Sequence, residues 1–187
     1  MLATEFLHGQ GLGNQLFCYV TTRMLAHRHG YDFGIKGLQS AGDSRVNQKG
    51  FYFMDLDYGK EVPDDLERYD EYRHALKTDE WIKTDLRLTD KTLLNIPDNR
   101  IIYGVMQSED YFGHHKEEIK KWLKVKEEHD THEYTKDNLC IMNFRGGEYM
   151  NSPTLVSKRY WERAMDNMRQ VRSDMEFMVV TDDVASA

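Results

Sequence analysis

The sequence predicts an α/β fold, because one pattern of strand, glycine-rich loop, helix and strand occurs twice. The first copy spans residues 2–36 and the second spans residues 139–181. Such alternation is typical of parallel sheets. Between the copies, residues 126–138 contain one aromatic and no aliphatic residue, as expected of a linker. We therefore predict an N-terminal domain at 1–125 and a C-terminal domain at 139–187.

The first copy opens with a β-compatible run, Leu2–Leu7, followed by a tight loop with three glycines at 8–13. A helix is predicted from Asn14, because apolar residues recur on one face at helical spacing. These residues are Leu16, Phe17, Val20 and Met24. Gly30 ends the predicted helix, and residues 31–36 form the next strand.

The rest of the first domain is predicted in less detail. Residues 51–54 are a candidate strand, and residues 63–76 a helix with proline in its first turn. Residues 77–100 show no clear pattern, whereas residues 101–106 read as a strand. Ser108 is a candidate cap for a following helix. The apolar stripe of that helix is Tyr111, Phe112, Ile119, Trp122 and Leu123.

The second copy begins with a predicted strand at 139–144 and a glycine-rich loop at 145–151. A helix is expected at 157–173 and a strand at 175–181. One face of the helix would carry Tyr160, Ala164, Met168 and Val171. A unit of about 45 residues is small for an independent core. We expect either that the natural chain continues or that this half depends on the first domain.

Composition excludes several classes. The formal net charge of −7 argues against a nucleic-acid-binding face, which would be basic. The two cysteines, Cys18 and Cys140, form no Cys-x-x-Cys pair, so we expect buried free thiols and no zinc cluster. No apolar run approaches the roughly 20 residues of a membrane span, and no signal peptide is recognisable. We expect a cytoplasmic protein without a transmembrane segment; the oligomeric state is left open.

The first loop carries a candidate anion site. Gly11 and Gly13 permit a positive φ or the close approach of a ligand. Asn14 follows where a helix begins, so its amide is placed either to cap the helix or to donate to a phosphate oxygen. The spacing fits neither a Walker A loop nor the dinucleotide fingerprint. A structural turn and a ligand-binding loop both remain open.

Two further loops also follow predicted strands. Arg145 lies after the strand at 139–144, where its guanidinium can grip a pyrophosphate while Gly146 and Gly147 keep the backbone open. Thr181 is followed by Asp182 and Asp183. A carboxylate there can accept a hydrogen bond from a nucleobase amine or a ribose hydroxyl, or can cap the next element.

Together with residues 107–112, these loops resemble the family 11 fucosyltransferases and the wider GDP-fucose-using superfamily. The first motif, Gly-Leu-Gly-Asn-Gln-Leu-Phe at 11–17, matches at all seven positions. The middle motif, Gln-Ser-x-x-Tyr-Phe, matches at 107–112. The ending Ser/Thr-Asp-Asp matches at 181–183.

The family's nucleotide motif is typically His-x-Arg-Arg-Gly-Asp-Tyr and corresponds to residues 143–149. The residues that match are Arg145, Gly147 and Tyr149. The residues that differ are Asn143, Gly146 and Glu148, which replace His, the second Arg and Asp. The donor assignment rests on this incomplete match.

The resemblance implies a GT-B fold, with two Rossmann-like domains facing a cleft and the second domain shortened. It implies an inverting, metal-independent transfer of fucose from GDP-fucose to a glycan hydroxyl, of α-1,2 type and without a cofactor. Arg145 would hold the donor pyrophosphate, and Asn14 would reach the cleft from the acceptor side. The implied binding residues are Gly11, Gly13, Asn14, Asn143, Arg145, Gly146, Gly147, Glu148, Asp182 and Asp183.

Three alternatives stay open. Asp55 and Asp57 form an Asp-x-Asp pattern that could bind a metal in a metal-dependent glycosyltransferase. The altered nucleotide motif also fits a degenerate family member that binds a glycan or nucleotide without turnover. His8 is a candidate general base. The other histidines considered, His114, His115, His129 and His132, are expected to be structural or linker residues.

Overall fold

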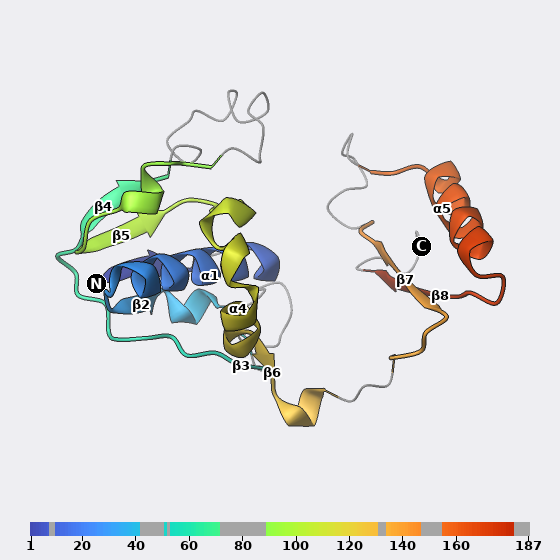
Figure 1. The fold of residues 1–187 in the computed structure, drawn as a ribbon, viewed down its shortest axis with the longest axis horizontal. Helices are drawn as coiled ribbons and strands as arrows, with labels where there is room; N and C mark the ends of the chain where they lie inside the picture. The colour runs from blue at the N-terminus through green and yellow to red at the C-terminus, as the bar shows by residue number, and fades with distance from the viewer. Residues whose placement is uncertain are drawn as a thin grey trace. The chain divides into compact units, whose positions relative to one another are not determined.

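The computed structural model describes residues 1–7, 10–41, 51, 53–71, 89–130, 134–146 and 155–181. The chain divides into two compact units, residues 1–130 and 131–187. The division falls inside the predicted linker, whose first part contains the 3₁₀ turn η5, Glu127–His129. In Figure 1 the first unit runs from blue to yellow and the second from orange to red.

Unit 1 is built on a parallel four-stranded sheet in the order β2-β1-β5-β4. Its strands are β1 (Leu2–Glu5), β2 (Phe33–Lys36), β4 (Glu67–Asp70) and β5 (Arg100–Tyr103). The mixed α/β fold with a parallel sheet is therefore confirmed. Because β1 and β5 are parallel neighbours, the chain leaves both strands at the same edge of the sheet, where their carboxyl ends lie. Adjacent loops at the carboxyl ends of parallel strands are where α/β proteins bind ligands.

Helix α1 (Leu12–His29) follows β1 and packs against the sheet, with Cys18 and Leu25 in one buried cluster with Leu2 of β1 (Figure 1). It ends at Gly30, which has the left-handed φ of 69°, as predicted. The predicted apolar stripe covers only part of the buried surface. Polar residues are buried as well, namely Gln15, Thr21 and Thr22.

Two predictions for residues 51–76 are wrong. The predicted helix at 63–76 contains strand β4 instead, within its described part. Parallel pairing with β5 outweighs the local preference of this charged segment, and the guanidinium of Arg68 lies 4.2 Å from the ring centroid of Tyr103 on β5. The predicted strand at 51–54 is reduced to β3 (Met54–Asp55), which pairs antiparallel with β6 (Lys124–Val125).

The segment after β5 is more broken than predicted. Instead of one helix it forms the 3₁₀ turns η3 (Glu109–Tyr111) and η4 (Gly113–His115), then helix α4 (Lys116–Trp122). Ser108 does cap η3, because its hydroxyl accepts from the N–H of Asp110 at 3.4 Å. Phe112, at φ −145° and ψ −3°, interrupts the helical path. The prediction of the cap is confirmed and that of a continuous helix is wrong.

Unit 2 consists of β7 (Leu139–Phe144), α5 (Lys158–Val171) and β8 (Glu176–Thr181). The strands pair in parallel over their whole length, from Leu139 with Glu176 to Phe144 with Thr181 (Figure 1). The predicted strand–helix–strand is thus confirmed. The predicted helix face is confirmed in part: Ala164 and Met168 are half-buried, whereas Tyr160 and Val171 are 54% and 79% exposed. The half-buried residues of α5 are Trp161, Ala164, Met165 and Met168.

Both cysteines are free thiols. Cys18 is fully buried, as predicted, whereas Cys140 is half-buried. Burial raises the pKa of the Cys18 thiol to about 12, so this group is poorly suited to act as a nucleophile. No helix among the described residues is both long and apolar enough to cross a membrane.

Candidate functional site

The predicted site residues fall into three groups. Gly11, Gly13 and Asn14 lie at the start of α1 in unit 1. Asn143, Arg145 and Gly146 lie at the end of β7 and just after it in unit 2. The remaining predicted residues lie outside the described part of the chain: His8, Gly147, Glu148, Asp182 and Asp183.

A hydrogen bond joins the first and middle motifs at the carboxyl edge of the unit 1 sheet. The Nε2 amide of Gln107 donates to Oδ1 of Asn14 at 2.6 Å. The rings of Phe17 and Phe112, one from each of the two motifs, pack with their centroids 6.1 Å apart. The pairing of β1 with β5 brings these motifs together, since each motif follows one of the two strands.

Asn14 does not cap α1, contrary to one of its two predicted roles. The helix begins at Leu12 after Gly11, which has extended backbone angles and provides no side-chain cap. Asn14 therefore lies in the first helical turn, with its carbonyl oxygen bound to Gln107. Its Nδ2 amino group is then the part of the side chain that can donate to a ligand, and Oε1 of Gln107 is the part that can accept.

Neither Gly11 nor Gly13 adopts a positive φ, which excludes one of the two roles that the sequence left open for them. Gly11 has φ −66°, and the glycines with positive φ in the described chain are Gly30, Gly37 and Gly59. A Cβ atom built on Gly11 or Gly13 would meet no atom within 4 Å. The described fold therefore gives no steric reason for glycine at either position.

Other residues of the helix start hold the surrounding loops. The buried amide of Gln15 donates to the carbonyl of Gln10 at 2.9 Å, and so secures the loop before the helix. The Cys18 thiol lies 3.5 Å from the carbonyl oxygen of Gly104 after β5. The hydroxyl of Thr21 donates to the carbonyl of Met106 at 3.4 Å. These buried polar contacts keep the two motif loops adjacent.

A pocket of about 310 Å³ opens beside the first motif in unit 1. Its lining residues are Gly13, Leu16, Phe17, Val20, Glu109, Phe112, Ile119 and Leu123. The walls are apolar and aromatic, and Glu109 is the one ionisable residue among them. Such a surface can pack against the C–H face of a sugar ring while a carboxylate accepts from its hydroxyls.

Sequence reasoning missed Glu71, which is fully buried directly after β4. Its carboxylate accepts hydrogen bonds from the backbone N–H groups of Val105 and Met106 and from the hydroxyl of Tyr111. Burial, and then the charge of Glu71, raise the pKa of Tyr111, which keeps that hydroxyl protonated. The wrong prediction of a helix at 63–76 hid Glu71, since an acidic residue at the end of a parallel strand would otherwise have been a candidate.

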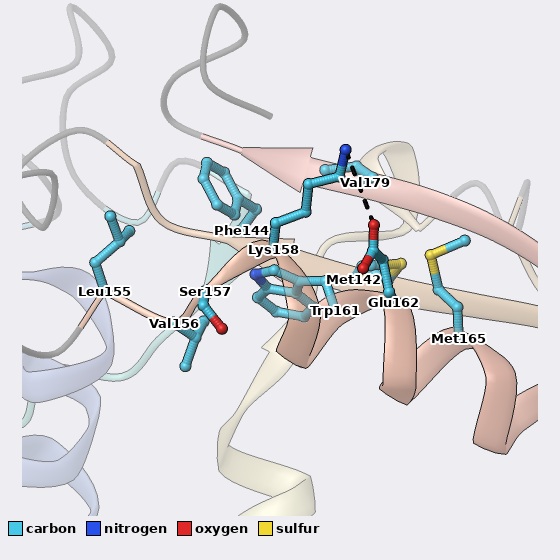
Figure 2. A pocket seen from close by; sticks show the side chains of 10 residues that line it. All are labelled: Met142, Phe144, Leu155, Val156, Ser157, Lys158, Trp161, Glu162, Met165 and Val179. Atoms are coloured by element: carbon cyan, nitrogen blue, oxygen red, sulfur yellow. Dashed lines mark ion pairs between the residues drawn. The ribbon is translucent and has the colours of Figure 1, made fainter.

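Unit 2 contains a larger pocket, of about 500 Å³, beside the end of β7 and the start of α5 (Figure 2). Phe144 and Trp161 provide aromatic walls, with ring centroids 6.3 Å apart. Lys158 and Glu162 form an ion pair at its edge, with 3.8 Å between nitrogen and oxygen. The indole N–H of Trp161 is buried without a hydrogen-bond partner. The pocket can therefore accept a flat, partly polar ring.

Arg145 lies directly after β7, with an exposed side chain. It is not among the ten residues that line the pocket in Figure 2. The register of β7 with β8 pairs Phe144 with Thr181, so the two strands end at the same edge of the unit 2 sheet. Asn143 is exposed and Gly146 is buried.

Of the two residues in the Asp-x-Asp pattern, Asp57 makes contacts within the fold. One carboxylate oxygen of Asp57 lies 3.2 Å from Arg23, and the other accepts from the N–H of Gly59 at 2.9 Å. Arg23 also stacks 4.5 Å from the ring of Trp122. Asp55 is exposed in β3. Among the described residues, no three His, Cys, Asp or Glu side chains form a group that could hold a metal.

Among the described histidines considered as metal ligands, His114, His115 and His129 line neither pocket. His114 is exposed and His115 is half-buried in η4. His129 ends η5 with an exposed side chain, and His132 lies outside the described residues.

Comparison of the sequence with models of known families and with curated proteins, and of the fold with solved structures, gave no significant match.

Proposed function

We propose that this chain is an inverting, metal-independent glycosyltransferase that moves fucose from GDP-fucose to a glycan hydroxyl, of α-1,2 type. The observation that carries the proposal is the hydrogen bond between Gln107 and Asn14. It joins the two motifs of the resemblance at the carboxyl edge of a parallel sheet, beside a pocket that both motifs line. A cytoplasmic location is part of this proposal.

The acceptor glycan binds to unit 1 in this proposal. Phe17 and Phe112 pack against the apolar face of a sugar ring, and Glu109 accepts from one of its hydroxyls. The amide pair of Asn14 and Gln107 offers one donor and one acceptor. A hydroxyl group both donates and accepts, so it matches this pair.

The GDP part of the donor binds to unit 2 in this proposal. Arg145 neutralises the pyrophosphate through two N–H groups of its guanidinium. Phe144 and Trp161 provide a stacking surface for the guanine ring. Asp182 or Asp183 contacts the nucleoside, as the resemblance implies.

In the reaction, the acceptor hydroxyl oxygen attacks the anomeric carbon of fucose from the face opposite to GDP. The new C–O bond forms as the bond between that carbon and the β-phosphate oxygen breaks, which inverts the configuration. The electron pair of the broken bond goes to GDP, where Arg145 stabilises the charge. The hydroxyl proton passes to a general base, for which His8 is the candidate from the sequence.

Calorimetric titration with GDP tests the donor side. We expect Arg145→Ala to weaken GDP binding about 30-fold, because a charge-assisted hydrogen bond contributes about 2 kcal/mol. Arg163→Ala is the matched control, since Arg163 is an exposed arginine of α5 in the same unit. An equal affinity for GDP in Arg145→Ala and the wild type would remove Arg145 from the donor site.

The metal-dependent alternative makes a different prediction for turnover. If Asp55 and Asp57 held a catalytic metal, EDTA would abolish fucose transfer, whereas our proposal predicts transfer at an unchanged rate. GDP binding without transfer to any acceptor would instead identify a nucleotide-binding module that lacks turnover.

A further inference from the structure

The carboxylate of Glu71 holds both ends of the segment that carries the middle motif. One oxygen, Oε2, accepts from the N–H groups of Val105 at 2.9 Å and Met106 at 2.8 Å, immediately before Gln107. The other oxygen, Oε1, accepts from the hydroxyl of Tyr111 at 2.8 Å, near the end of the motif. A single buried side chain therefore fixes where the motif starts and where it ends.

The backbone at the start of this segment has an uncommon shape that depends on Glu71. A Cβ atom on Gly104 would lie 2.5 Å from Oε2 of Glu71, so the close approach requires glycine there. Met106 has a φ of 49°, a region that residues other than glycine seldom occupy. Such a conformation persists where the surrounding structure over-determines it, and the two hydrogen bonds to Oε2 provide that constraint.

The segment between these anchors presents the residues that face the unit 1 site. Gln107 reaches Asn14, while Glu109 and Phe112 line the pocket. Glu71 is not among the residues that line the pocket, and it is not a partner in the Gln107–Asn14 hydrogen bond. It can influence them only through the position of the segment.

We propose that Glu71 is a positioning residue, which sets the place of Gln107 against Asn14 and of Glu109 and Phe112 in the pocket. Its effect on turnover rests on the proposed function, whereas its effect on the position of Gln107 does not. The test therefore has a structural arm and an activity arm.

Three variants separate the anchors. Glu71→Ala removes both. Tyr111→Phe removes the bond to Oε1, together with the bond that the Tyr111 hydroxyl accepts from the N–H of Asp90 at 2.8 Å. Glu71→Gln keeps one oxygen for the two backbone N–H groups and lets its amino group donate to the Tyr111 hydroxyl, which accepts through two lone pairs. Glu67→Ala is the control, since Glu67 is an exposed glutamate on the preceding strand and pairs with Arg100 at 2.7 Å.

The structural arm follows the side-chain amide of Gln107 by ¹⁵N NMR. Glu71→Ala is expected to shift this resonance toward that of a solvent-exposed amide, while Glu71→Gln and Glu67→Ala leave it in place. Tyr111→Phe is expected to shift the ring resonances of Phe112. An unmoved Gln107 resonance in folded Glu71→Ala overturns the proposal; if that variant does not fold, unmoved Phe112 resonances in Tyr111→Phe overturn it.

The activity arm measures fucose transfer with GDP-fucose as donor. Glu71→Ala is expected to lower kcat about 100-fold, as a misplacement of about 1 Å can, with KM for GDP-fucose within about twofold of the wild type. Glu71→Gln should recover most of the rate. Equal losses in Glu71→Gln and Glu71→Ala would contradict positioning by hydrogen bonds. If the wild type transfers no fucose, the proposed function fails, while the NMR arm still decides the role of Glu71.

Discussion

The Nε2 atom of Gln107 lies 2.6 Å from Oδ1 of Asn14, although 93 positions separate the two residues in the chain. The contact exists because β1 and β5 are neighbours in a parallel sheet and each is followed by one of the two residues' loops. Because the carbonyl oxygen of Asn14 accepts from Gln107, its amino group is the part of the side chain that can donate to another group.

This contact predicts an energetic coupling between the two residues. Asn14→Ala and Gln107→Ala should show a coupling free energy of about 0.5 to 1 kcal/mol in a double-mutant cycle of urea unfolding. The effects of Asn14→Ala and Glu67→Ala should be additive. Glu67 begins β4 and pairs with Arg100, the first residue of β5, whereas Asn14 follows the other end of the parallel strands. A strictly additive Asn14–Gln107 pair would show that the hydrogen bond contributes nothing to stability.

Replacing glycine by alanine should have opposite effects on stability at Gly13 and at Gly104. Gly13→Ala should stabilise the fold by about 0.5 kcal/mol, since alanine favours the helix and its Cβ has open space. The same change should weaken acceptor binding if Gly13 admits a ligand. Gly104→Ala should destabilise by about 1 to 3 kcal/mol, because its Cβ would overlap Glu71. Thermal unfolding and acceptor KM are the measurements; unchanged KM in Gly13→Ala would refute the ligand role.

The prediction from sequence succeeded where local pattern and tertiary structure agree. The strand of unit 2 at 139–144 is apolar and followed by glycines, and it was placed correctly at both ends. Gly30 and Ser108 were recognised because helix ends have specific chemistry. The charged residues of β4 follow no strand alternation, and only pairing with β5 makes them a strand.

Only some residues of the candidate site could be predicted from the sequence. The resemblance named Asn14 and Gln107 together, but no sequence pattern specifies that their side chains bond. Glu71 was hidden by the error at β4. The buried Gln15 and Thr21 were also missed, because apolar periodicity counts polar residues as exposed even where they bond to neighbouring loops.

The buried thiol of Cys18 predicts a loss of stability in alkaline solution. Burial raises its pKa from 9.0 to about 12, so above pH 9 the unfolded chain loses the proton that the native state retains. The free energy of unfolding should therefore fall between pH 9 and 12, by at most about 1.4 kcal/mol per pH unit from this group.

The control for that prediction is Cys18→Ala, in which the fall with pH should be shallower. Tyrosines whose pKa burial raises contribute to the remaining slope above pH 10; they include Tyr69 and Tyr103, raised to about 12, and also Tyr19, Tyr58 and Tyr111. Urea unfolding at several pH values provides the measurement. The same slope in Cys18→Ala and the wild type would mean that the thiol does not stay protonated in the fold.

The unit 2 pocket predicts a fluorescence response to GDP. Stacking of guanine on Trp161 should quench its emission, and Trp161→Phe should abolish the response. Trp122→Phe is the control, because Trp122 lies in unit 1 against Arg23. A quenching signal that persists in Trp161→Phe would place the nucleotide elsewhere.

Fucose transfer is measured by mass spectrometry of a glycan panel incubated with the wild-type chain and GDP-fucose. We expect at least one glycan to gain a single deoxyhexose at a 2-hydroxyl, only when GDP-fucose is present, and we expect Arg145→Ala to suppress this gain while Arg163→Ala does not. An unchanged panel, from protein whose thermal unfolding shows that it is folded, would rule out the proposed transfer.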